Sequence, residues 1–412
     1  MEIVPMLFVL AGLVLYVVLA GADFGAALWQ VTAPRDEKGR ALRALAHDAM
    51  GPVWEANHVW LIFVLTVTWT AYPEALGSLA STLSIALSVA AFGIITRGAA
   101  YATSSGTSDP RELWRIDALS AISSILAPFA LGACVGALAS GRVPYGNARG
   151  DLWSSWLNPT SIAIGVLSVV LSAYLAAVYL CADARRRGHE ELVAPYRARA
   201  LGAGAVAGVL SVVGLVVLHE DAHGLYRELV TGNGLPALIV SVLAGAGTIA
   251  LVLRGRYEPA RFTAALAVAA VVAGWALAQQ PRFLPGLTVQ QAAAPHDTLV
   301  AVTVAIVGGG VLLFPSLVLL LRLTLGGALG HGGDEDHGPD RGAPDAARTT
   351  TAPPFPVPTA ARVAGACLVA GFGLLTIAEA SWAHAIGVVL LLGFVVAGFL
   401  AAVPEWLAPD AG

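Results

Sequence analysis

An acid and an imidazole stand at the start of a long apolar run in this sequence. Glu55 and His58 lie between Trp54 and Trp60, within the stretch Pro52–Leu61. A charged side chain inside hydrocarbon costs several kcal/mol unless it finds a partner or water, so it is by default a candidate for function. Glu55 and His58 are three residues apart and share one face of a helix. A carboxylate beside an imidazole can accept and release protons, which favours proton transfer.

Two further ionisable residues stand near the ends of neighbouring apolar runs. Asp23 belongs to the first run and Arg97 to the third. Two interpretations remain open: the group conducts protons, or Arg97 neutralises one of the carboxylates in a static ion pair. Aromatic residues concentrate at membrane interfaces, so the tryptophans are expected to anchor or pack. The candidate catalytic residues are Asp23, Glu55, His58 and Arg97, and the structural motif around them is Trp54, Asn57 and Trp60.

The composition indicates an integral membrane protein. Of the 412 residues, 57% are hydrophobic and 12% are charged, and the mean hydropathy is +0.75. A soluble domain has roughly 25% charged residues. The net charge of -4 comes from scattered loops with no basic stripe, so nucleic acid is not an expected partner. Membrane lipid is.

Helical spans follow from the thickness of the hydrocarbon, since about 30 Å needs about 20 residues of helix. Tyr72-Pro73 and Asn158-Pro159 mark helix boundaries. The fold class is therefore all-α, a polytopic helix bundle with a nine-span body and two additional C-terminal spans. The predicted spans are 4–28, 54–72, 75–101, 114–139, 158–181, 200–218, 235–253, 260–279, 298–323, 362–379 and 383–402.

A composition change divides the chain into three parts. Residues 326–360 are rich in Gly, Pro, Asp and Thr and bury too little apolar surface to fold, so they are predicted to be a disordered linker. The linker separates the body, 1–325, from a two-span extension, 361–412. The sequence suggests no function for this extension.

The basic residues predict the orientation. Loops after the odd-numbered spans, with Arg97 included, hold 19 of the 23 Lys and Arg residues. By the positive-inside rule these loops are cytoplasmic, which places the N-terminus outside and the C-terminus inside. Asp23, Glu55, His58 and Arg97 then share one depth near the cytoplasmic face.

At these residues the chain resembles subunit II of the cytochrome bd quinol oxidases. The resemblance is carried by Gly21-Ala22-Asp23-Phe24-Gly25, by Pro52 to Leu61, by Ala71-Tyr72-Pro73 and by Arg97-Gly98, with looser agreement at Asn158-Pro159 and Thr288 to Ala294. It covers about residues 1–325.

This resemblance implies a subunit that pairs with a haem-bearing subunit I in the plasma (inner) membrane of a prokaryote. The partner is expected to hold haem b and haem d, to oxidise quinol and to reduce oxygen to water. Acids matching Asp23 and Glu55 line a proton route from the cytoplasm in that family, and the arginine matching Arg97 belongs to the same cluster. The resemblance identifies no cofactor-binding residue in this chain, and a structural quinone is a further candidate ligand.

The sequence departs from the family pattern at four positions of this route. Ala20 and Ala102 replace two acids, Glu55 replaces the usual aspartate, and His58 replaces Gln or Glu. The route is expected to use His58 or water in place of the lost carboxylates, or to be closed.

Two other classes remain open: a secondary transporter and a purely structural membrane partner. Transporters place charges near the midplane between broken helices, whereas these charges gather at one face. His219 to His223 contains metal-ligand residue types, but spacing alone fixes no coordination geometry, so no metal site is assigned. Gly202, Gly204 and Gly208 are expected to allow close helix packing.

Overall fold

A computed structural model describes residues 1–104 and 110–325 and scattered positions between 363 and 397. The side chains of residues 50–56, most of 101–118 and 312–325 lie outside that description. The chain divides into two compact units, Met1–Gly330 and His331–Gly412. The predicted linker at 326–360 lies outside the described residues, and so does most of the predicted two-span extension.

The first unit is built from helices, as the sequence predicts, with one small β-hairpin. In chain order the elements are α1 Val4–Val31, α2 Glu37–Ala71, α3 Pro73–Thr82, α4 Ser84–Ser104, α5 Pro110–Ala139, α6 Pro159–Arg186, α7 Glu190–Asp221, α8 His223–Val230, α9 Leu235–Leu253, α10 Tyr257–Gln279, β1 Arg282–Leu284, β2 Leu287–Thr288, α11 Val289–Ala292 and α12 His296–Leu325.

Several of these helices are long and apolar enough to cross a membrane. Within the described residues there are six, or seven if the bent pair Asn57–Ala71 and Pro73–Thr82 forms one span. The chain is thus an integral membrane protein, and the count of nine plus two spans stays a prediction. Large apolar side chains of α7, such as Val209 and Val212, are exposed on the outside of the unit, as expected for a surface that faces lipid.

The third predicted span, 75–101, is not one continuous helix. Just before this span the chain bends by 120° between Ala71 and Pro73. Within the span, α3 ends at Thr82 and α4 begins at Ser84. Pro73 favours the bend because it cannot continue the hydrogen bonding of the preceding helix. The break at Leu83 joins two apolar segments, so hydropathy could not detect it.

The second predicted span, 54–72, is the end of a much longer helix. α2 begins at Glu37, where the Asp36 carboxylate accepts a hydrogen bond of 2.8 Å from the Gly39 N–H and caps the helix. The first turns of α2 are polar, so a hydropathy window misses them. The boundary at Asn158-Pro159 is as predicted: the Asn158 side chain accepts a bond of 2.9 Å from the Ser161 N–H and caps α6.

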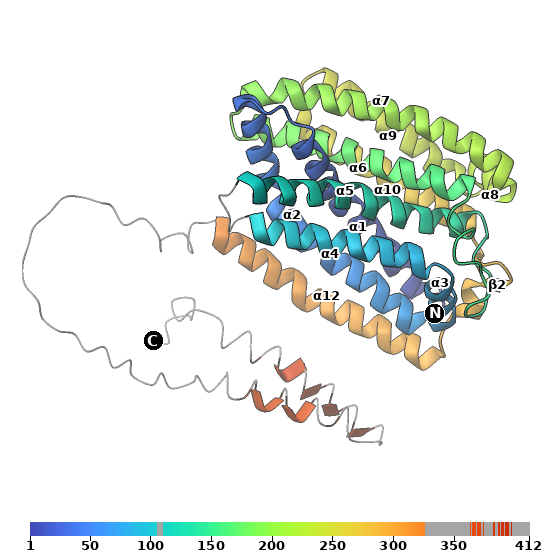
Figure 1. Ribbon diagram of the computed structural model, residues 1–412. Coiled ribbons are helices and arrows are strands. Elements are labelled where there is room, and N and C mark those ends of the chain that lie inside the picture. The colour runs from blue at the N-terminus through green and yellow to red at the C-terminus, as the bar shows by residue number, and fades with distance from the viewer. Residues whose placement is uncertain are drawn as a thin grey trace, which may run out of the picture. The chain divides into compact units, whose positions relative to one another are not determined.

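The helices form a bundle in which α1 is surrounded. α1 packs against α2, α5, α6 and α10. Figure 1 shows α7 on one side of the unit and α12 on the other, with α3 and the β-hairpin gathered at one end. The residue pattern of α1 fits this place, because a continuous block from Ala20 to Ala27 is buried.

Close approach of α1 and α6 depends on Gly25. A methyl group at Gly25 would overlap the backbone carbonyl of Ser172. Small residues let helix backbones meet in membranes. The same expectation for the glycines of α7 is right only at Gly204, which faces Ile249 and Tyr174; a methyl group at Gly202 or Gly208 would meet nothing within 4 Å.

Candidate functional site

The structure joins Asp23 of α1 to Arg97 of α4 in a buried ion pair. Arg97 Nη2 donates to Asp23 Oδ1 over 2.7 Å, and the side chains are 6% and 1% exposed. The sequence left open whether Arg97 pairs with Asp23 or with Glu55. Among the described residues its partner is Asp23. A charge pair at this burial needs further hydrogen bonds to offset its desolvation.

Ser120 of α5 supplies one of those hydrogen bonds. Arg97 Nη1 donates to Ser120 Oγ over 3.0 Å, so the two arms of the guanidinium contact two different groups. Asp23 Oδ2 and Arg97 Nε are buried and have no hydrogen-bond partner among the residues described. Among the described residues, the carboxylate is therefore held at one oxygen only.

Ser120 was not predicted as a site residue; it begins a buried polar strip on α5. The hydroxyls of Ser123 and Ser124 donate to the Ser120 carbonyl over 2.8 Å and 2.5 Å, and all three side chains are buried. The available signal was the spacing of these serines, which puts them one helical turn apart on α5.

The tryptophan-bracketed stretch of α2 is only partly visible. Asn57 is buried, and His58 is half-buried with contacts of its own. Trp60 packs against a cluster that contains Tyr16, Ala20 and Phe24 of α1, and its ring meets Phe63 edge-on at 6.0 Å. Trp60 thus packs the helix interface. The side chains of Trp54 and Glu55 lie outside the described residues, so their predicted roles stay predictions.

An apolar cavity of about 360 Å³ is lined in part by residues of α1 that flank Asp23 in the sequence. Tyr16, Ala20 and Phe24 line it near Asp23, and Gln279, Gln280 and Arg282 line it at the end close to the β-hairpin. Ala20, where the family resemblance implies an acid, is part of the apolar wall. The Nε1 of Trp275 is buried without a hydrogen-bond partner in the described part of the chain, and this side chain also lines the cavity.

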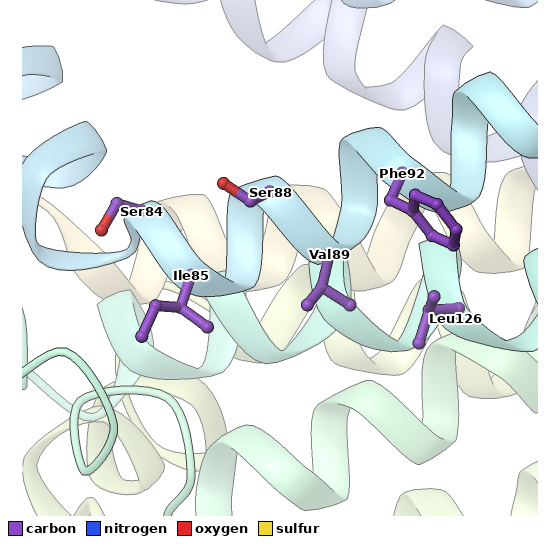
Figure 2. A pocket seen from close by; sticks show the side chains of 6 residues that line it. All are labelled: Ser84, Ile85, Ser88, Val89, Phe92 and Leu126. Carbon is purple, nitrogen blue, oxygen red and sulfur yellow. The ribbon is translucent and has the colours of Figure 1, made fainter.

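A second hollow is an open groove on the surface of α4 and α5. Figure 2 shows Ser84, Ile85, Ser88, Val89, Phe92 and Leu126 along it. It contains no ionisable side chain, and its apolar lining suits a hydrocarbon chain of the surrounding lipid. We assign no chemistry to it.

Asp221, in the stretch with metal-ligand residue types, belongs to an ion pair. Both of its carboxylate oxygens accept from Arg142, over 2.6 Å and 2.8 Å, and the Thr160 hydroxyl donates to it over 2.6 Å. The hydrogen bond to Asp221 raises the pKa of the Arg142 guanidinium. The described residues contain no group of three His, Cys, Asp or Glu side chains that could hold a metal ion. This network links α6 and α7 and was not foreseen.

These features define a class: a helical membrane protein that buries a charged polar cluster beside an apolar cavity. The family model of cytochrome bd terminal oxidase subunit II matches residues 1–324. The chain belongs to that family, which is part of a quinol oxidase complex, an oxidoreductase of the respiratory chain.

Relatives agree with this assignment. A putative cytochrome bd menaquinol oxidase subunit II of Bacillus subtilis (strain 168) is 22% identical over 235 residues, which cover 56% of this chain and 67% of the relative. In the bd oxidase structure from Geobacillus thermodenitrificans, one chain is similar at a TM-score of 0.65 and 24% identity. The match covers 79% of this chain and 98% of that one. This likeness establishes the fold of the body.

Proposed function

We propose that this chain pairs with a haem-bearing subunit I and delivers protons from the cytoplasm to the site where that partner reduces oxygen. The observation that carries the proposal is the Asp23–Arg97 pair, because ionisable side chains buried this completely in a membrane helix bundle are costly and are therefore by default candidates for function. The haems of the partner would supply the redox chemistry, and quinol and oxygen would be the substrates of the complex. The Bacillus subtilis relative carries menaquinol in its name, which supports a quinol here.

The ion pair suggests how a proton would be held. Asp23 Oδ1 stays on Arg97 while Oδ2 has no protein donor among the described residues, so Oδ2 is the atom that accepts the proton. Protonation weakens the attraction to Arg97, and the positive guanidinium then favours release. We propose that Glu55 and His58 of α2 pass protons to this pair. Ala20 and Ala102 cannot take part.

The orientation also belongs to the proposal. With the N-terminus outside and the C-terminus cytoplasmic, Asp23 and Arg97 lie toward the cytoplasm, where protons for oxygen reduction are taken up. The distribution of basic residues between alternate loops supports this orientation.

We further propose that the apolar cavity holds a structural quinone. Its apolar walls suit an isoprenoid tail. The indole N–H of Trp275, which has no partner among the described residues, and the amide of Gln279 suit a quinone carbonyl. Extraction of the purified complex with organic solvent should release a quinone beyond the amount bound by a Trp275→Phe variant. Equal quinone content in the two preparations would contradict this assignment.

The pairing is tested by purifying the full chain from its native membrane. The chain should co-purify with a haem-bearing membrane protein that has a chlorin absorption band and consumes oxygen when given quinol. Recovery of the chain without a haem protein, together with uptake of a solute by vesicles that contain it alone, would point to a transporter instead.

A further inference from the structure

We propose that Ser120 is a positioning residue for proton transfer: by holding one arm of the Arg97 guanidinium, it keeps the second oxygen of Asp23 available to a proton. This inference rests on the proposed function of the Asp23–Arg97 pair and assigns a role to a residue of α5 within it.

The pairing of Arg97 differs from the usual arrangement. Arginine commonly binds a carboxylate with two parallel N–H···O bonds. Arg97 instead places Nη2 on Asp23 Oδ1 and Nη1 on Ser120 Oγ. Ser120 engages Nη1, so that arm makes no second bond to the carboxylate, and neither Nη1 nor Nε is seen to donate to Asp23 Oδ2.

The same chain contains the other arrangement for comparison. Arg142 binds Asp221 through both Nη atoms and both carboxylate oxygens, and the Thr160 N–H and hydroxyl also donate to Oδ2. Both oxygens of Asp221 are therefore occupied, as expected for a pair that holds helices together. One difference between the two pairs is the hydroxyl of Ser120, which accepts from one arm of Arg97.

Neighbouring serines provide matched controls on the same helix. Ser123 and Ser124 are as buried as Ser120, but their hydroxyls donate to the Ser120 carbonyl, one turn back on α5. Such local bonds contribute little to a helix. Removing one of these hydroxyls changes the composition of α5 but keeps Ser120 Oγ, the acceptor for Arg97 Nη1.

Loss of the Ser120 hydroxyl would leave Arg97 Nη1 buried without an acceptor. An unsatisfied buried donor is costly, and a charged one more so. The donor would then turn to the carboxylate that Arg97 already contacts, and Asp23 would be held at both oxygens. Proton transfer through Asp23 should slow because the proton must displace a hydrogen bond.

The test compares Ser120→Ala, Ser120→Thr and Ser123→Ala in the whole purified complex. Ser120→Ala should slow oxygen consumption about tenfold, the effect of one such hydrogen bond, with unchanged KM for quinol and unchanged haem absorption. Its solvent deuterium isotope effect should rise because a proton transfer becomes rate-limiting. Ser120→Thr, which keeps the hydroxyl, and Ser123→Ala should both retain the wild-type rate.

Other outcomes would overturn the inference. Equal slowing by Ser123→Ala, or a wild-type rate in Ser120→Ala, would remove the positioning role. Failure of both Ser120→Ala and Ser120→Cys to assemble, while Ser120→Thr assembles, would make the contact purely structural. If Asp23→Asn slows turnover and Ser120→Ala does not, this inference fails alone; if Asp23→Asn has no effect, the proposed function fails as well.

Discussion

Removing both charges of the Asp23–Arg97 pair distinguishes a proton carrier from a static ion pair. Arg97→Gln alone leaves a buried carboxylate without its partner, which should cost about 3–5 kcal/mol of stability and lower the yield of assembled complex. Asp23→Asn combined with Arg97→Gln removes both charges and should recover much of that yield. The yield is measured as haem bound per purified complex.

The activity of the recovered double variant then separates the two roles. If Asp23 carries protons, oxygen consumption should stay low although the haem content returns. Recovery of both haem content and oxygen consumption would show that the two charges only neutralise each other in a static ion pair.

Sequence reasoning could identify the charges but not their hydrogen bonds. Asp23 and Arg97 stand out because ionisable residues are rare in apolar runs. Ser120 does not, since serines are common in membrane helices and usually bond to their own backbone, as Ser123 and Ser124 do. The choice of Asp23 as the partner of Arg97 depends on where the bundle places α1 and α4, which spacing along the chain does not determine.

The approach of α1 to α6 positions Asp23, and Gly25 makes that approach possible. Gly25→Ala would place a methyl group against the Ser172 carbonyl, and overpacking of this kind costs about 1–3 kcal/mol. The melting temperature of the detergent-solubilised complex should fall. Gly208→Ala on α7 is the matched control, because its methyl group meets nothing within 4 Å; an equal fall in both variants would show that the contact is unimportant.

Hydropathy predicted which segments of the chain form helices, but it did not predict the lengths of these helices or the breaks between them. Hydropathy windows located the apolar part of α2 but not its polar start at Glu37. They also predicted one continuous span across the break at Leu83. Hydropathy reports which residues favour hydrocarbon. A bend between two apolar segments leaves that signal unchanged.

The body of the chain is expected to be sufficient for assembly. The family match ends at residue 324, the first compact unit ends at Gly330, and the related Geobacillus thermodenitrificans chain is covered almost completely by 79% of this one. A chain that ends after Gly330 should co-purify with the haem-bearing partner and retain oxygen consumption within about twofold, because a twofold change corresponds to less than 1 kcal/mol. Loss of the partner on truncation would assign an assembly role to residues 331–412.

Proton delivery to the oxygen-reducing partner is tested most directly by the rate of quinol-driven oxygen consumption in the purified complex that carries Asp23→Asn together with Glu55→Gln. These substitutions keep side-chain size and remove both proton-accepting carboxylates. The expected result is a rate at least tenfold lower, as for loss of an acid–base group, with haem content equal to that of the wild-type complex. An unchanged rate at equal haem content would contradict the account.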